Sequence, residues 1–239
     1  MNIAIIFAGG VGQRMNSKSV PKQFLELYGK PIIIYTLEVF EAHRDIDGIV
    51  ISCVNGWIEH LSSLIKHFNL TKISRIVKGG ETGQDSIYNA LAAAEILYPN
   101  DSIVLIHDGV RPIIDLELIT RNINCVKENG SAITSVPVSE TFATFDDKRH
   151  ISMIPNREAV IIAKAPQSFI LSEILAVHKN AIADGLHTFI DSCSMMYYYN
   201  KKLTLVEGDS SNIKITRPID FYLFRAIIDA RENSQIFGM

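Results

Sequence analysis

The alternation of short apolar runs with helical patterns constrains the fold more than any other feature of this sequence. The apolar runs are nearly continuous, which indicates strands that are buried on both faces. Strands of this kind form parallel sheets that are covered by the connecting helices. We therefore expect an α/β fold with a mostly parallel sheet flanked by helices. Strands are predicted over 3–7, 48–54, 73–78 and 102–108, and helices over 31–42, 58–68, 86–97 and 116–129.

The pattern loosens from residue 131 onward. The segment 141–154 contains an acidic turn and predicts a hairpin that protrudes from the main body. No internal repeat or linker is present, so we expect one domain over 1–239 with a β-arm inserted at about 138–156. Further strands are predicted over 132–137, over 160–163 with an end at Pro166, and over 203–207; helices over 171–184, 192–199 and 220–233; and a short extended segment over 212–216.

Composition and net charge limit the kinds of molecule that the protein is expected to bind and the compartment in which it is expected to act. The chain has 239 residues, 47% of them hydrophobic and 21% charged, which is ordinary for a soluble globular protein. A net charge of −3 argues against general nucleic-acid binding but permits a local basic pocket. No apolar run is long enough to span a bilayer, and the N-terminus has no secretion signal. Cys53, Cys125 and Cys193 form no C-x-x-C pair, which favours reduced thiols and a cytoplasmic protein.

A glycine-rich segment, F-A-G-G-V-G-Q-R-M, follows the first predicted strand. Gly9, Gly10 and Gly12 allow the backbone to approach a ligand closely and to aim several N–H groups at a polyphosphate. Arg14 and Lys22 add positive charge at the same place. The spacing is that of neither a P-loop nor a dinucleotide fingerprint. A simple tight turn is the alternative, but two cations beside a proline favour a loop that binds a nucleoside triphosphate.

A second cluster, H-D-G-V-R-P, stands at the carboxyl end of the strand predicted over 102–108. Ligands bind at these ends of open α/β sheets. Asp108 therefore orients a divalent cation or holds a sugar hydroxyl; alternatively, it caps the following turn and pairs with Arg111. We interpret His107 as a packed or orienting histidine and not as a general base.

Other segments carry weaker signals. Gly80 and Gly83 permit close approach to a base or ribose, although Asp85 or Ser86 as the N-cap of a helix would explain the same loop. Lys214 alternates with two isoleucines, so it points away from a buried face.

Arg157 and Lys214, taken singly, also fit solvated surface charges, and Asp191 fits a helix N-cap as well as a ligand contact. The usual nucleophile and zinc-hydrolase motifs are missing. The cations therefore indicate charge stabilisation during a phosphoryl-type transfer, in which the substrate supplies the attacking oxygen.

Six ordered motifs extend over essentially the whole chain: A-G-G-x-G-x-R-M, P-K-Q-F, G-G-x(5)-S, H-D-x-x-R-P, R-x(8)-P-Q-x-F and N-I-K-I-T-x-P. Taken together, they resemble the motifs of the sugar-alcohol-phosphate cytidylyltransferases. This family includes enzymes for 2-C-methyl-D-erythritol 4-phosphate and for D-ribitol 5-phosphate. The resemblance implies a Rossmann-like sheet of the nucleotide-diphospho-sugar transferase type, and a β-arm that is exchanged in a homodimer.

The resemblance also implies roles for individual residues. Arg14, Lys22, Arg157 and Lys214 would be catalytic, and Asp108 would lie near Mg²⁺. CTP would be bound by Phe7, Ala8, Gly9, Gly10, Gly12, Gly80, Glu81, Gly83, Gln84, Asp85, Ser86 and Gly109. The acceptor would contact Asp108, Arg111, Thr141, Arg157, Asp191 and Lys214.

Four positions depart from the usual family pattern. Gly83 replaces a common arginine, Gly109 an alanine or serine, and Ala165 and Ile190 each replace a threonine. The last two changes remove hydroxyls from the acceptor side and favour D-ribitol 5-phosphate, for a surface polysaccharide, over methylerythritol phosphate, for isoprenoid synthesis. The segments 51–53, 57–58 and 168–169 also look more like the ribitol branch. A hexose-1-phosphate nucleotidylyltransferase, which shares the glycine-rich loop and its lysine, is an alternative. The changes at Gly83, Ala165 and Ile190 also leave open a nucleotide-binding module without turnover, but the retained cations Arg14, Lys22, Arg157 and Lys214 argue against it.

Overall fold

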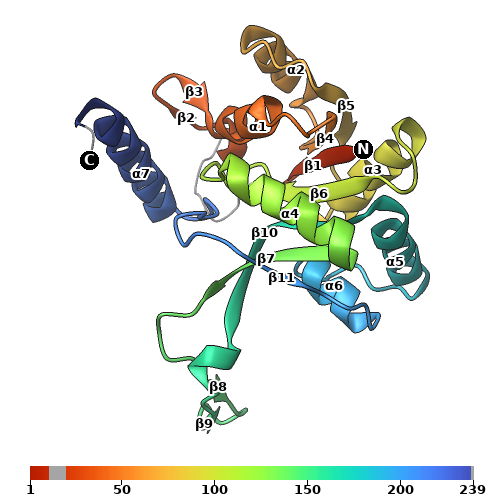
Figure 1. Ribbon diagram of the computed structural model, residues 1–239, viewed down its shortest axis with the longest axis vertical. Coiled ribbons are helices and arrows are strands. Elements are labelled where there is room, and N and C mark those ends of the chain that lie inside the picture. Colours follow the sequence, from red (N-terminus) through yellow and green to blue (C-terminus); the bar gives the residue numbers. More distant parts are fainter. Residues whose placement is uncertain (11–19, 238–239) are drawn as a thin grey trace.

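A seven-stranded, mostly parallel sheet forms the centre of the computed structural model, which describes residues 1–10 and 20–237 (Figure 1). The strand order is β11-β7-β10-β6-β1-β4-β5. β10 runs antiparallel to both of its neighbours, β6 and β7, whereas the other pairs are parallel. The strands are β1 (Asn2–Ala8), β4 (Gly48–Cys53), β5 (Ile73–Lys78), β6 (Ile103–Asp108), β7 (Ser131–Pro137), β10 (Ile161–Ile170) and β11 (Leu205–Glu207).

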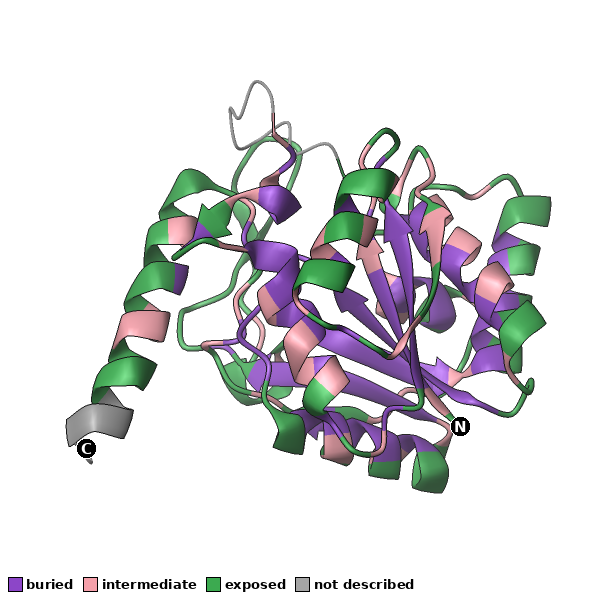
Figure 2. Ribbon diagram, turned by 90° about the horizontal axis from the view of Figure 1, so that it is seen from above, coloured by how far each residue is buried: buried purple, intermediate pink, exposed green. Residues whose placement is uncertain are grey.

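Helices cover both faces of this sheet, as Figure 2 shows by the buried strands and the exposed outer turns of the helices. The helices are α1 (Ile32–Ala42), α2 (Ile58–His67), α3 (Gly83–Leu97), α4 (Leu116–Asn129), α5 (Leu171–Ala183), α6 (Ser192–Tyr198) and α7 (Pro218–Phe237). A short antiparallel pair, β2 (Glu26–Leu27) and β3 (Lys30–Pro31), precedes α1. In the described part of the chain, no helix is both long and apolar enough to cross a membrane.

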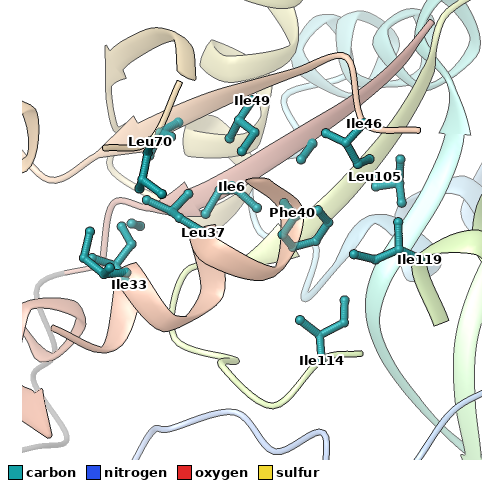
Figure 3. Packing of buried hydrophobic residues seen from close by; sticks show 14 of the residues in the cluster. Ile6, Ile33, Leu37, Phe40, Ile46, Ile49, Leu70, Leu105, Ile114 and Ile119 are labelled. Atoms are coloured by element: carbon teal, nitrogen blue, oxygen red, sulfur yellow. The ribbon is translucent and has the colours of Figure 1, made fainter. Parts of the chain in front are cut away.

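The two faces of the sheet have separate cores. On one face, Leu37 and Phe40 of α1 and Ile119 of α4 pack against Ile6 and Leu105 of the central strands (Figure 3). On the other face, apolar residues of α3 and α5 pack against the alternate residues of the same strands. Each central strand is therefore buried on both sides, which explains its continuous apolar sequence.

The helix α3 begins at Gly83, three residues before the predicted start. Its N-cap is Thr82, whose hydroxyl accepts a hydrogen bond from the Asp85 backbone N–H, while the Asp85 carboxylate accepts one from the Thr82 N–H. The alternative that the sequence left open, with Asp85 or Ser86 as the N-cap, is therefore not what the structure shows. The capping box satisfies two N–H groups at once and extends the helix toward the loop.

The strand β10 continues to Ile170 instead of ending at Pro166. Its register with β7 shifts between Ala163 and Gln167, and the ladder resumes after the proline. Proline lacks the N–H that the hydrogen-bond ladder of a sheet needs, so the shift in register occurs around Pro166. The segment 212–216, predicted to be extended, contains no strand.

Two short antiparallel strands, β8 (Thr144–Phe145) and β9 (Ile151–Met153), lie in the segment that predicts a hairpin. All five of their residues are exposed. In Figure 1 this pair lies at the bottom, away from the central sheet. A single turn of 3-10 helix, Arg157–Ala159, follows it before β10.

Candidate active site

Two adjoining hollows lie at the carboxyl ends of β1 and β6. The larger hollow has a volume of about 790 Å³, and the smaller one about 200 Å³. Four residues line both of them: Phe7, Gly83, Asp108 and Lys214. The two hollows therefore meet at a junction that holds one carboxylate and one ammonium group.

Two glycine segments form the wall of the larger hollow. A Cβ atom added at Gly79 would lie 2.9 Å from the Gly9 Cα and 3.2 Å from the Cys53 carbonyl oxygen, so only glycine permits this backbone contact. The Gly80 N–H donates to the Ser86 hydroxyl at 3.0 Å, and that hydroxyl donates to the Thr82 carbonyl at 2.9 Å. The Ser86 side chain is thus engaged in holding the loop.

The segment of Lys22 is tied to the same loop. Gln23, buried beside it, donates through Nε2 to the Ala8 carbonyl at 2.7 Å and to the Gly10 carbonyl at 3.2 Å. Lys22 donates through Nζ to the Ile215 carbonyl at 3.1 Å. Lys22 and Lys214 are therefore brought to one hollow from opposite ends of the sequence. The predicted residues Gly12 and Arg14 lie outside the described residues.

Asp108 is the electrostatic centre of the junction. It is only 4% exposed, and its carboxylate forms ion pairs with Lys214 and, at 3.2 Å, with the Arg111 Nε. Burial raises the pKa of Asp108, but the Lys214 ammonium and the Arg111 guanidinium outweigh this effect and lower the pKa to about 2. The carboxylate is thus charged at neutral pH. The ion pair with Arg111, which the sequence analysis gave as an alternative role for Asp108, is present. Lys214 is a second cation that pairs with the same carboxylate.

His107 is fully buried, as interpreted from sequence. Its Nε2 lies 3.0 Å from the Arg111 carbonyl oxygen, and its ring contacts Phe40 edge-on. Burial lowers the pKa of His107 to about 4, so the ring is neutral. It lines neither hollow and supports the turn that carries Arg111.

The structure brings most of the described predicted residues to the two hollows. Asp191 lines the smaller hollow and is also the N-cap of α6, where its carboxylate accepts from the Ser194 N–H at 2.8 Å. Asp85 and Gly109 line neither hollow. The residues that line one or both are Phe7, Ala8, Gly9, Gly10, Lys22, Gly80, Glu81, Gly83, Gln84, Ser86, Asp108, Arg111, Asp191 and Lys214.

Arg157 and Thr141 are not brought to the hollows within the single chain. Both are exposed and lie on the segment that contains β8 and β9. Neither lines the larger or the smaller hollow. One chain therefore gathers Lys22, Arg111 and Lys214, but not Arg157.

Sequence reasoning assigned no role to four polar residues of the smaller hollow: Lys164, Gln167, His178 and Ser192. Lys164 donates through Nζ to the carbonyl oxygens of Ser210 at 2.8 Å and Asn212 at 3.2 Å. His178 follows Leu171, Ile174 and Leu175 at helical spacing, so a polar residue on an apolar stripe was the available signal. For Lys164 we find no such signal in the sequence.

A sheet whose carboxyl ends carry two glycine segments, three lysines (Lys22, Lys78 and Lys214) and a buried carboxylate is typical of a nucleotide-binding α/β protein. The chain belongs to the 2-C-methyl-D-erythritol 4-phosphate cytidylyltransferase family, whose family model matches residues 2–230. It is accordingly a nucleotidyltransferase of the cytidylyltransferase type.

Individual relatives divide between two names. The chain is 54% identical over 239 residues, all of both chains, to a ribitol-5-phosphate cytidylyltransferase of Streptococcus agalactiae. It is 39% identical over 228 residues to a 2-C-methyl-D-erythritol 4-phosphate cytidylyltransferase of Clostridium botulinum, covering 95% of this chain and 97% of the relative. A solved 4-diphosphocytidyl-2C-methyl-D-erythritol synthase of Anaerococcus prevotii superposes with a TM-score of 0.83 at 27% identity, covering 95% and 96% of the two chains.

Proposed function

We propose that this enzyme joins CTP and D-ribitol 5-phosphate to form CDP-ribitol and pyrophosphate. The observation that carries the choice of acceptor is the 54% identity, over the full length, to a relative named for ribitol 5-phosphate. The 39% identity to a methylerythritol phosphate enzyme is lower. Ala165 and Ile190, which replace hydroxyl-bearing threonines of the common pattern, both line the smaller hollow. This location supports a change of acceptor and not of nucleotide.

In this proposal, CTP occupies the larger hollow and the acceptor occupies the smaller one. The N–H groups of Gly9 and Gly10 face the triphosphate, and the segment 80–86 surrounds the cytosine and ribose. This chain has Gly83 where an arginine is common in the family. A Cβ atom added at Gly83 would meet nothing within 4 Å, so the loop has open space at this position. The reacting groups meet at the junction, between Asp108 and Lys214.

The chemistry is an in-line displacement at phosphorus. An oxygen of the acceptor's phosphate attacks the α-phosphorus of CTP, the bond to the oxygen that bridges the α- and β-phosphates breaks, and pyrophosphate leaves with the bonding electrons. Lys22 and Lys214, together with Arg14, stabilise the negative charge that develops on the α-phosphate. The residue Asp108 keeps the junction polar and orients Lys214 through their ion pair.

The donor set fits a magnesium ion that is held mainly by substrate. No group of three or more His, Cys, Asp or Glu side chains suited to a metal occurs among residues 1–10 and 20–237. Mg²⁺ at nucleotide sites usually takes one or two carboxylates together with phosphate oxygens and water. Asp108, a hard oxygen donor at the junction, would be the protein ligand. When bound, Mg²⁺ supplies positive charge to the triphosphate.

We also propose that the chain is a single domain with an arm at about 138–156, and that this arm packs on a second copy to form a homodimer. Five apolar side chains of the arm are 47–67% exposed: Phe142, Phe145, Ile151, Met153 and Ile154. Exposed apolar groups that cluster in this way mark interaction surfaces. In such a dimer, Arg157 and Thr141 reach the acceptor hollow of the partner, which reconciles their implied roles with their positions.

A complementation assay tests this arrangement. Arg157→Ala and Lys214→Met homodimers should each be weakly active, because each lacks one cation in both sites. Random exchange of subunits turns about half of the dimers into heterodimers, each with one site in which both cations are intact. We therefore expect an equimolar mixture to recover activity toward about a quarter of the wild-type level. If Arg157 acts within its own chain, mixing restores nothing.

The acceptor is tested with purified enzyme, CTP, Mg²⁺ and each alditol phosphate, by following pyrophosphate release. We expect kcat/KM for D-ribitol 5-phosphate to exceed that for methylerythritol phosphate by tenfold or more. The opposite preference would assign the enzyme to isoprenoid synthesis. Thermal shifts with CTP, UTP, GTP and ATP should single out CTP, and a preference for UTP or GTP would favour a hexose-1-phosphate enzyme.

We infer that the enzyme acts in the cytoplasm, where CTP is made and where Cys53, Cys125 and Cys193 remain free thiols. Its product would serve the synthesis of a surface polysaccharide.

A further inference from the structure

The inner wall of the smaller hollow carries two buried polar side chains without protein partners. His178 of α5 is 1% exposed, and neither of its ring nitrogens has a hydrogen-bond partner. Ser192, the first residue of α6, is 3% exposed, and its hydroxyl is likewise without a partner. Both residues line the hollow that also contains Asp108 and Lys214.

The other uncharged polar side chains of this wall are satisfied within the described chain. Gln84 donates to the Leu186 carbonyl at 2.8 Å and accepts from the Phe189 N–H at 3.1 Å. Gln167 donates to Asp191 and accepts from the Cys193 N–H, both at 2.8 Å. The lack of partners at His178 and Ser192 is therefore not a general property of the wall.

A buried polar group without a partner is costly, so such groups normally have a role or an additional partner. The helix position of His178 suits a leucine, because its neighbours on the same stripe are Leu171, Ile174 and Leu175. A leucine at position 178 would avoid the unfavourable free energy of burying a polar group without a hydrogen-bond partner. The presence of a histidine is thus explained if a ligand in the hollow supplies the missing hydrogen bonds.

The chemistry of the two groups selects an uncharged, hydroxyl-bearing ligand portion. Burial lowers the pKa of His178 to about 4, with Asp85 as the nearby charge that opposes this shift, so the ring is neutral at neutral pH. A neutral imidazole offers one donor and one acceptor, and a serine hydroxyl offers both. A polyol hydroxyl complements each of them. A phosphate, which only accepts, is served by Arg111 and Lys214 instead.

We propose that His178 and Ser192 hydrogen-bond the hydroxyl groups of the acceptor's polyol chain and set the enzyme's preference among alditol phosphates. The inference rests on the proposed function. Ala165 and Ile190 supply no hydroxyl to this hollow, and Ala163, Phe189 and Met195 are apolar. His178 and Ser192, which have no other hydrogen-bond partner, therefore recognise the configuration of the acceptor's hydroxyl groups.

The test compares His178→Leu and Ser192→Ala with a matched control, Ser102→Ala. Ser102 is also fully buried with an unpartnered hydroxyl, but it lines neither hollow. We expect each hollow variant to raise the KM for D-ribitol 5-phosphate about tenfold, with kcat and the KM for CTP changed less than about twofold. Ser102→Ala should leave all three values unchanged.

A second readout separates recognition from folding. The thermal midpoint of His178→Leu at neutral pH should not fall, because the substitution removes an unsatisfied group from an apolar stripe. The wild-type preference for ribitol 5-phosphate over arabinitol and xylitol 5-phosphates should shrink in both hollow variants. Ser192→Ala, a small change, keeps the test valid even if His178→Leu does not fold.

Unchanged acceptor KM and unchanged preference in both variants would overturn the inference while leaving the proposed function intact. If the wild-type enzyme turns over no alditol phosphate with CTP, the proposed function fails and the inference fails with it. A rise of the CTP KM equal to that of the acceptor would also overturn it, because the two residues would then act on the site as a whole.

Discussion

Asp108 shows how single residues set the electrostatics of this site. A carboxylate that is 4% exposed is costly to charge, and it stays charged because Arg111 and Lys214 face it. The two cations come from different parts of the chain, and the Arg111 Nη1 also donates to the Asn212 carbonyl at 2.7 Å. Arg111 thereby holds the segment that carries Lys214. The charge of the junction and its geometry thus depend on the same side chains.

Substitution of Lys214 tests this dependence. Lys214→Met removes the charge but keeps the length, and we expect kcat/KM to fall about a hundredfold because a cation at the reacting phosphate is lost. Both KM values should rise, since Lys214 lines both hollows. Steady-state kinetics with each substrate varied in turn provides the measurement. Lys66→Met, on the exposed side of α2, is the control, and a loss below threefold in Lys214→Met would contradict the assignment.

At the scale of elements, a buried polar network fixes the strand that forms one wall of the acceptor hollow. Asn122 of α4 donates to the Thr134 hydroxyl at 3.1 Å and accepts from the Ser168 hydroxyl at 3.0 Å. Thr134 in turn donates to the Pro166 carbonyl at 2.7 Å, at the irregularity of β10. The network therefore joins α4, β7 and β10 beside Ala165 and Gln167.

Asn122→Ala should lower the free energy of unfolding by about 2–3 kcal/mol, because it leaves two buried hydroxyls with fewer partners. Urea denaturation measures this change. Asn129→Ala, at the exposed end of the same helix, should change stability by about 0.5 kcal/mol or less. Equal effects of the two substitutions would show that the network contributes nothing specific.

At the scale of the whole molecule, three buried histidines, His43, His107 and His178, couple stability to pH, because burial lowers the pKa of each. His107 is 0% exposed and His178 is 1% exposed, and burial lowers the pKa of each to about 4 from an ordinary value of 6.5. Arg111 and Lys214 face His107 as cations and Asp108 as an anion; Asp85 is the nearby charge for His178. Between pH 6.5 and 4 the unfolded chain binds protons at these positions and the folded chain does not.

Stability should therefore be constant above about pH 6.5 and fall as the pH drops toward 4, by on the order of 3 kcal/mol for each of His107 and His178. Denaturation midpoints at pH 7.5, 6 and 5 test the direction. His178→Leu should show a shallower dependence, because one of the three groups is gone. A stability that rises on acidification in this range would contradict the assigned protonation states.

Apart from the end of β10 and the short pair β2–β3, the sequence alone determined the strands and helices to within a few residues, together with the mostly parallel sheet and the chemical types at the site. It could do so because periodicity, glycine and charge act over short stretches of chain. Only the tertiary structure decided that Lys22 contacts the Ile215 carbonyl 193 residues away, that Lys214 pairs with Asp108, that His178 borders a hollow, and that Arg157 lies outside it. These relations depend on how distant elements pack, because side chains that meet in space leave no common pattern along the chain.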